Sequence, residues 1–514
     1  LFAGRRIMFS RVISGTVQGI DAVMIQVEAD MSDGLPAFVM VGYLSSCVRE
    51  AAERVRTALR NSGVSVPPRR ITVNLSPADI RKDGTAFDLP IAVCILISMG
   101  IISEEAIKNT MIIGELGLNG DINGVPGVLS MVHYASEHGI NRFIVPRANM
   151  EEAGLIKGIE VIAVSGLQEL IDYECNGRKV IHDMNKSTGY YPDDCYDLGD
   201  FADIKGQVML KRGVEIAVAG LHNIMMTGAA GSGKTMIARR IPTIMPKLTF
   251  DESIEVTKIY SVAGMLKNGR GLITKRPFRA PHHTISTTAL VGGGVIPGPG
   301  EISLADHGVL FLDEFPEFGR NVLETLRQPL EDREVNISRL SGRYRFPADF
   351  MLVTARNNCP CGGWPNANKC TCTYKQIRNY NARISGPLLD RIDINVDVVR
   401  VDVEELFDHR ENESSETIRK RVMAAQEIQQ ERYRHEKIKF NSGLDGGLIN
   451  KYIKINGDVR DILREMYEKS QLSARGNNRI LKIARTIADL AGDTDIQEKH
   501  VREAIFYRMK ENGV

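Results

Sequence analysis

The chain has 514 residues, 43% hydrophobic and 25% charged, a folded globular composition that excludes intrinsic disorder and collagen-like repeats. Lysine and arginine total 65 against 64 aspartates and glutamates, so the net charge indicates neither a nucleic-acid nor a membrane partner. The longest apolar run, residues 89–100, is shorter than the roughly 20 residues of a membrane span and predicts a buried core segment.

No secretory signal opens the chain, and its few cysteines indicate a reduced, cytoplasmic protein. Residues 1–7 are predicted to be a cloning remnant before a natural start at Met8. Residues 8–172 alternate short β-rich runs with helical stretches, such as 48–62 and 128–138, which predicts an α+β domain. Residues 173–200 are polar and turn-forming and are predicted to be a linker.

Residues 201–400 again alternate strands and helices, and two fully apolar strands there are typical of a parallel sheet covered on both faces. Residues 401–514 consist of charged, amphipathic helical segments and predict a helical domain. The sequence therefore predicts a multidomain α/β protein with a parallel central sheet.

The strongest motif is a glycine-rich loop, GAAGSGKT, that directly follows the apolar run 223–227 and directly precedes a helical segment. This context is that of a phosphate-binding P-loop, whose backbone N–H groups and helix N-terminus hold phosphate. Lys234 is expected to reach the β and γ phosphates of ATP, and the Thr235 hydroxyl to bind Mg²⁺. The predicted nucleotide-binding residues are Gly228, Ala229, Ala230, Gly231, Ser232, Gly233, Lys234, Thr235 and Met236.

A second apolar strand, GVLFL, ends in Asp313 and Glu314. Following a P-loop, Asp313 is expected to hold the Mg²⁺ and Glu314 to act as the general base that polarises the attacking water. Together the two motifs predict a Mg²⁺-dependent ATPase.

The motif pair resembles AAA+ ATPases. The segments RPFRAPHHT, LVGGGVIPGPGEISLADHGVLFLDE, LSGRYRFPADFMLVTARNNCPCG and SGPLLDRIDI resemble the magnesium-chelatase-like ATPases of the YifB/ComM family, with a likeness that extends from Met8 over essentially the whole chain. The resemblance implies an AAA+ core at 201–400, a C-terminal helical lid at 401–514 and a hexameric ring. It also implies a DNA helicase that acts in branch migration during recombination or natural transformation.

The resemblance also assigns roles to single residues. It implies that Asn357 is the sensor that positions the water, with Asn358 as a rival, and that Arg391 is an arginine finger reaching a neighbouring subunit's site. It implies that Arg475 is the second sensor, with Arg479 as the competing candidate. A surface salt bridge is the alternative for either arginine.

Two insertions of this ATPase group line the central pore, and they correspond to residues 287–300 and the predicted hairpin 335–346. The hairpin carries Arg339, Arg343 and Arg345, whose six copies in a ring would contact the phosphates of single-stranded or branched DNA. Arg276, Arg279, His282 and His283 are expected to extend this basic ring. A plain solvated hairpin is the alternative.

Four cysteines lie close together in two C-x-C pairs, Cys359, Cys361, Cys370 and Cys372. Four thiolates in a short loop predict a structural Zn²⁺ site, and four reduced thiols are the alternative.

Residues 8–172 resemble the Lon-type protease domain, which has the ribosomal S5 domain 2-like fold, most clearly in RKDGTAFDLPIAVCIL and GELGLNGDINGVPGVLSMVHYA. A Lon-type protease needs a serine nucleophile and a lysine base. The resemblance places Asp88 and Leu129 at those positions, with Thr85 and Ser130 as shifted substitutes. The domain is therefore predicted to be an inactive protease fold that serves binding or assembly. A chelatase-like motor that remodels a protein partner remains the alternative to a DNA motor.

Overall fold

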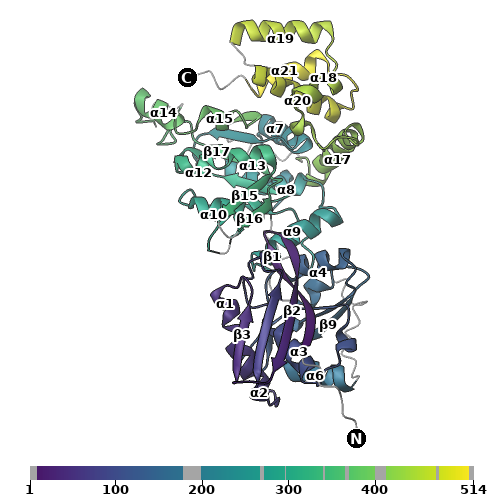
Figure 1. Ribbon diagram of the computed structural model, residues 1–514. Coiled ribbons are helices and arrows are strands. Elements are labelled where there is room, and N and C mark those ends of the chain that lie inside the picture. The colour runs from purple at the N-terminus through teal and green to yellow at the C-terminus, as the bar shows by residue number, and fades with distance from the viewer. Residues whose placement is uncertain are drawn as a thin grey trace.

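A computed structural model describes residues 9–176, 198–266, 271–295, 297–339, 342–364, 370–399, 412–470 and 474–508. The chain forms an N-terminal sheet, a central sheet and a group of C-terminal helices that follow one another along one axis (Figure 1). The predicted cloning remnant lies outside the described residues. Helix α6 (Leu167–Asn176) continues four residues into the predicted linker 173–200, which corrects the start of that linker; residues 177–197 lie outside the described part.

The N-terminal part is built on a seven-stranded mixed sheet of order β3-β4-β2-β1-β5-β8-β9. Its strands are β1 (Phe9–Gln18), β2 (Asp21–Ser32), β3 (Ala37–Val41), β4 (Arg70–Ser76), β5 (Thr110–Ile112), β8 (Arg142–Pro146) and β9 (Glu160–Val164), beside the small pair β6 (Glu115–Leu116) and β7 (Ile122–Asn123). Its helices, besides α6, are α1 (Ser46–Arg49), α2 (Ala51–Asn61), α3 (Asp88–Ser98), α4 (Val128–Glu137) and α5 (Met150–Ala153).

Two hydrophobic cores lie on opposite faces of this sheet because successive strand residues point to opposite sides. Ile112 joins the core under α2, α3 and α6, whereas its neighbour Met111 joins the core under α4 and α5. Every residue of α3 is buried, which confirms the apolar run as a core segment as far as Ser98; Met99 is half-buried and Gly100 is exposed. The predicted helix 48–62 is interrupted at Glu50, which ends α1 and precedes α2.

The central part is built on a five-stranded sheet of order β11-β14-β17-β10-β18, in which every pair is parallel. Its strands are β10 (Ile224–Gly228), β11 (Phe278–Arg279), β14 (Val309–Leu312), β17 (Met351–Arg356) and β18 (Ile394–Val398), with two hairpins, β12 (Gly292–Gly293) to β13 (Gly298–Pro299) and β15 (Glu334–Arg339) to β16 (Gly342–Pro347). Its helices are α7 (Val208–Gly220), α8 (Lys234–Ile244), α9 (Phe250–Val262), α10 (Thr287–Val291), α11 (Glu301–Leu304), α12 (Arg320–Glu324), α13 (Arg327–Asp332), α14 (Tyr374–Asn381) and α15 (Gly386–Leu389).

The predicted parallel sheet covered on both faces is present. Along β14, Val309 and Phe311 face the core under α7 and α8, whereas Leu310 and Leu312 face the core under α10–α13. A strand that is buried on both faces is apolar at every position, so β14 could be predicted from its continuous apolar run in the sequence.

The C-terminal helices are α17 (Ser415–Arg432), α18 (Gly446–Tyr452), α19 (Gly457–Ser470), α20 (Ala474–Ala491) and α21 (Glu498–Phe506). They share one continuous hydrophobic core with α7, α8 and one face of the central sheet. None of the described helices is long and apolar enough to cross a membrane.

The N-terminal part contacts the central part in two places. Helix α4 packs on α9, where the Gly127 N–H donates to Ser261 Oγ over 3.0 Å. The turn between β1 and β2 reaches the β15–β16 hairpin, as the purple strands in Figure 1 show. At this turn Gly19 approaches the Arg345 backbone so closely that a Cβ on Gly19 would lie 2.5 Å from the Arg345 carbonyl oxygen.

Candidate active site

The glycine-rich loop joins β10 to α8 at the carboxyl edge of the central sheet, as the motif predicts. Gly231 and Gly233 have φ angles of +75° and +91°, a region that favours glycine. Lys234 begins α8 and is buried, and its Nζ donates to the carbonyl oxygens of Gly228 and Ala229, each over 2.9 Å. Burial lowers the pKa of Lys234, and the charge of Asp313 opposes that shift. A buried cation at the positive end of a helix is an arrangement that an anion would stabilise.

Thr235 and Asp313 meet at the mouth of this loop. The Thr235 hydroxyl donates to Asp313 Oδ2 over 2.6 Å, and both groups are accessible from solvent. A hydroxyl and a carboxylate are oxygen donors that Mg²⁺ prefers, and Mg²⁺ in such sites keeps waters and nucleotide oxygens as its other ligands. The pair therefore fits the Mg²⁺ of a bound nucleotide.

Glu314 has an unusual backbone conformation for a residue with a side chain, with φ at +52°. Such strain costs about 1–3 kcal/mol and concentrates at functional sites. The Glu314 carboxylate lies 3.1 Å from His283 Nδ1, and His283 also contacts the edge of the Phe318 ring. His283 is thus a residue of this site whose contact the sequence did not predict, because the segment 276–284 was assigned to a basic pore surface.

Asn357 and Asn358 follow β17, and the structure separates them. Asn357 Oδ1 accepts a hydrogen bond from Lys234 Nζ over 3.2 Å, whereas Asn358 Nδ2 donates to the Trp364 carbonyl in the cysteine loop. Asn357 therefore faces the phosphate-binding loop, and Asn358 faces away from it.

The arginine-finger candidate Arg391 and the second-sensor candidates Arg475 and Arg479 are not among the hydrogen-bond partners of Lys234 in the described residues. Arg391 donates to the Pro387 carbonyl over 2.6 Å and pairs with Glu331 of α13. Arg391 also lines a surface hollow of about 440 Å³ that contains no residue of the glycine-rich loop. Arg479 is buried and pairs with Asp390, and Arg475 is exposed on the first turn of α20.

The hairpin predicted at 335–346 is β15–β16, and its arms pair from Glu334 with Pro347 to Arg339 with Gly342. Arg343 and Arg345 lie opposite Ser338 and Asn336 on the exposed face, whereas Arg339 belongs by alternation to the other face, near Gly293. Arg345 also pairs with Glu334. Two of the three arginines therefore share one face of the hairpin, and Arg339 belongs to the other.

The four residues expected to extend that basic surface have other partners, which corrects the expectation. Arg279 forms a bidentate ion pair with Glu301 at 2.6 Å for both contacts, and Arg276 is largely buried beside Glu252 at 3.3 Å. His283 pairs with Glu314, and His282 Nδ1 lies 2.9 Å from the Thr284 hydroxyl.

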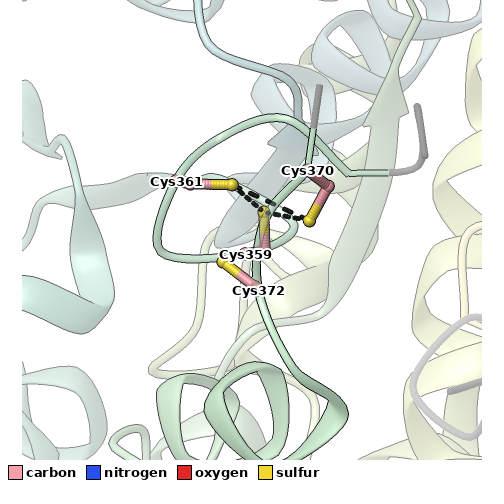
Figure 2. A group of neighbouring side chains, drawn as sticks. All are labelled: Cys359, Cys361, Cys370 and Cys372. Atoms are coloured by element: carbon pink, nitrogen blue, oxygen red, sulfur yellow. Dashed lines mark hydrogen bonds between the residues drawn. The ribbon is translucent and has the colours of Figure 1, made fainter. Parts of the chain in front are cut away.

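The four cysteines of the predicted metal loop lie together (Figure 2). Cys359 Sγ lies 3.4 Å from Cys361 Sγ and 3.7 Å from Cys370 Sγ, and all four sulfur atoms lie within 4.8 Å of one another. Zn–S bonds of about 2.3 Å place tetrahedral sulfurs about 3.8 Å apart, so the donor set fits Zn²⁺. Hydrogen bonds from the Gly363 and Thr371 backbone lower the pKa of Cys361 to about 6, which favours its thiolate form.

This cysteine loop also contacts the phosphate-binding loop. The Gly362 carbonyl accepts a hydrogen bond from the Ala230 N–H over 3.4 Å. A Cβ on Gly362 would lie 3.1 Å from the Ala230 Cβ, and Gly362 has a φ of +72°. The conformation of the cysteine loop is therefore coupled to the backbone that surrounds Lys234.

In the N-terminal part, the position that the Lon resemblance assigns to a serine is filled by a buried ion pair. Arg54 Nε and Nη2 donate to the two carboxylate oxygens of Asp88 over 2.7 and 3.0 Å. The Leu116 N–H donates to the same carboxylate. Leu129 and Ser130 are buried, and Thr85 donates to Glu115.

Comparisons with known proteins agree with a P-loop ATPase of the chelatase type. Family profiles described as "Magnesium chelatase, subunit ChlI", "Subunit ChlI of Mg-chelatase" and "Magnesium chelatase, subunit ChlI C-terminal" match residues 200–406, 27–149 and 412–508. The chain is 40% identical to the YifB protein of Salmonella typhimurium over 495 residues, which cover 95% of each chain. It is 39% identical to the competence protein ComM of Haemophilus influenzae over 503 residues, 97% of each chain.

The chain belongs to the YifB/ComM family of magnesium-chelatase-like ATPases. A separate similarity, 32% over 129 residues, relates a quarter of the chain to Lon protease 2 of Bacillus subtilis.

Proposed function

We propose that this protein hydrolyses ATP with Mg²⁺ in a ring and uses the energy to move along DNA. The main support for this proposal is a set of contacts at the carboxyl edge of the central sheet. There Lys234 donates a hydrogen bond to Asn357, and Thr235 donates one to Asp313. Bound Mg²⁺ would neutralise phosphate charge. Thr235 and Asp313 hold the ion, Lys234 exchanges its carbonyl partners for phosphate oxygens, and Glu314 takes the proton of the attacking water.

The ring part of the proposal rests on Arg391. Its described polar partners are Pro387 and Glu331, not the glycine-rich loop of its own chain. An arginine supplied in trans contributes about 10³ to 10⁵ in rate to phosphoryl transfer. We therefore expect hydrolysis to require self-association, in a hexamer by analogy with the family, and the exposed Arg475 to act on the lid side of the nucleotide.

The DNA part rests on the exposed face of the β15–β16 hairpin. Arg343 and Arg345 are exposed there, beside Ser338 and Asn336 of the paired strand. Such a face contacts phosphates by charge and is independent of sequence. The relative from Haemophilus influenzae is named a competence protein, ComM. We propose that the DNA motor acts in the same kind of process, in branch migration during recombination or natural transformation.

The test is ATP turnover of the purified protein with and without single-stranded and branched DNA, over a range of salt concentrations. Lys234→Ala is the blank for contaminating ATPases. We expect DNA to stimulate turnover in a salt-sensitive manner, and the stimulation to fall when Arg343 and Arg345 are replaced. Turnover that no DNA changes would contradict the DNA part and leave the ATPase part standing.

A second candidate is a motor that remodels a protein partner, as the chelatase family profiles imply. One observation favours it: Val295, at the tip of the β12–β13 hairpin, is 88% exposed, so its apolar side chain is available to contact a protein partner. Replacing Val295 by Ser separates the two functions. The DNA motor keeps its DNA-stimulated turnover in that variant, whereas a protein-remodelling motor loses its partner-stimulated turnover.

We also propose that the four cysteines hold one structural Zn²⁺, which fixes the loop against Ala230. In metal-free protein, Cys361 should be alkylated by iodoacetamide with a pH midpoint near 6, because its thiolate is the reactive form and its pKa is about 6. Zn²⁺ should suppress this reaction, and Cys361→Ser should lower the bound zinc, whereas Cys47→Ser, at an isolated cysteine, should not. Zinc content that is unchanged in Cys361→Ser would contradict the site.

A further inference from the structure

A second group of metal-binding side chains lies at the start of β14, on the opposite edge of the sheet from the nucleotide site. Glu255 comes from α9, and Asp306 and His307 come from the turn that precedes β14. His307 Nε2 lies 2.9 Å from Glu255 Oε2 and 3.5 Å from Asp306 Oδ2. His307 and Asp313 are six positions apart, roughly 20 Å along an extended strand, so this group is distinct from the Mg²⁺ ligands of the ATPase.

Asp306 carries an oxygen that lacks a hydrogen bond. Its side chain is 1% exposed, and its Oδ1 accepts from the Asp349 N–H over 2.7 Å. Its Oδ2 is buried and accepts no hydrogen bond from the described residues, and it points toward His307 and Glu255. A buried carboxylate oxygen without a donor costs about 1–3 kcal/mol or more, which a ligand at that oxygen would offset.

The backbone of His307 fixes the position of its imidazole ring. His307 has a φ of +53°, its N–H donates to the Asp349 carbonyl over 2.9 Å, and its own carbonyl accepts from Arg276 Nη1 over 2.7 Å. On the far side of the ring, Nδ1 lies 3.9 Å from Glu252 Oε1. This separation is longer than a hydrogen bond, so the position of the ring is set by the backbone contacts and not by Glu252.

We propose that Glu255, Asp306 and His307 bind one divalent transition-metal cation. Bonds of about 2.0–2.2 Å from a metal to nitrogen and oxygen place tetrahedral ligand atoms about 3.3–3.6 Å apart. The 3.5 Å distance from His307 to Asp306 lies in this range, and the 2.9 Å hydrogen bond from His307 to Glu255 would lengthen when an ion replaces its proton. The cation replaces the proton on His307 Nε2, which is released to solvent, and Glu255, with 40% of its side chain exposed, leaves room for water as a further ligand.

The donor set decides which cations fit. One imidazole and two carboxylates suit Mn²⁺, Fe²⁺, Co²⁺ or Zn²⁺, whereas Ca²⁺ and Mg²⁺ take oxygen ligands alone. The bound ion ties α9 to the start of β14. Because α9 also carries Ser261 and Lys258, which contact Gly127 and His133 of α4, the ion would stiffen the helix on which the N-terminal part docks.

The test is titration of the full-length protein with Mn²⁺, without nucleotide, followed by electron paramagnetic resonance. Mn²⁺ is the probe because the thiolates of the cysteine loop bind it poorly. We expect one Mn²⁺ per chain with a nitrogen coupling from the His307 ring. Asp306→Asn and Glu255→Gln should each weaken binding at least tenfold, and His307→Gln should also remove the nitrogen coupling.

Three controls keep the result interpretable. Glu255→Gln alters a partly exposed side chain and should fold even if the buried variants do not. His435→Gln, at a histidine of the C-terminal helices, should leave Mn²⁺ binding unchanged. Asp313→Asn should also leave it unchanged. If Asp313→Asn abolishes binding, or if Glu255→Gln binds Mn²⁺ as the unaltered protein does, the proposed site is wrong, whatever the ATPase assays show.

Discussion

Asp88, in the N-terminal part, and Lys234, in the central part, occupy equivalent places: each is the first residue of a helix that follows a glycine-containing turn. Asp88 is held by a bidentate Arg54 ion pair, whereas Lys234 is held by backbone carbonyl oxygens and Asn357. A helix N-terminus favours the anion and disfavours the cation. The comparison shows that Lys234 is available to bind a ligand, because its partners are neutral and can be exchanged. Asp88 is not available, because the positive charge of Arg54 already neutralises it.

Glu314→Gln should have the largest effect on the ATPase side of this comparison. Loss of a general base lowers turnover by about 10²- to 10⁴-fold, while the phosphate contacts of Lys234 keep ATP binding. Turnover and ATP affinity, measured by an enzyme-coupled assay and by nucleotide fluorescence, check this. The control variant in the N-terminal part, Asp88→Asn in α3, should leave kcat unchanged. Normal turnover in Glu314→Gln would refute the role of Glu314.

Asp88→Ala should destabilise the N-terminal sheet by about 3 kcal/mol, because it leaves the Arg54 guanidinium without its partner in a largely buried place. The double change Arg54→Met with Asp88→Leu should recover most of that loss, since no buried charge remains. Hydrogen exchange at the amides of α3 measures the free energy of local opening. If the α3 amides exchange equally slowly in Asp88→Ala and in the unaltered protein, the Arg54–Asp88 ion pair does not contribute to the stability of the N-terminal part.

Arg343→Ala and Arg345→Ala should each weaken DNA binding. Each should also reduce the slope of log K against log salt concentration by about the amount that one phosphate contact contributes. Arg339→Ala should change it less, because Arg339 belongs to the other face of the hairpin. Fluorescence anisotropy with labelled single-stranded DNA at several salt concentrations compares the three variants. An Arg339 variant that is weaker than the other two would overturn the assignment of faces.

Gly19→Ala should have the smallest effect and tests the contact between the two regions. A Cβ there would meet the Arg345 carbonyl oxygen at 2.5 Å, so the β1–β2 turn should separate from the hairpin. Gly63 has nearly the same φ, +79°, with nothing within 4 Å, so Gly63→Ala reports the backbone strain alone. We expect Gly19→Ala to expose the β15–β16 amides to hydrogen exchange about tenfold more than Gly63→Ala does; no difference would show that the contact is not stabilising.

The sequence by itself determined the local parts of this protein: the glycine-rich loop, the apolar strand before Asp313, the parallel sheet and the cysteine pairs. These parts can be predicted from the sequence because each depends on residues that are close together in the chain. The spacing of those residues is fixed by one backbone conformation or by one set of ligand atoms.

Only the tertiary structure decided which distant residues meet. It paired His283 with Glu314, Arg54 with Asp88, and the neighbours Asp306 and His307 with Glu255, and it divided the hairpin arginines between two faces. The physical reason is that a side chain's charge has no fixed role in a sequence. Its role depends on which partner the packed core brings within hydrogen-bond distance, and that partner is set by the contacts of the whole fold.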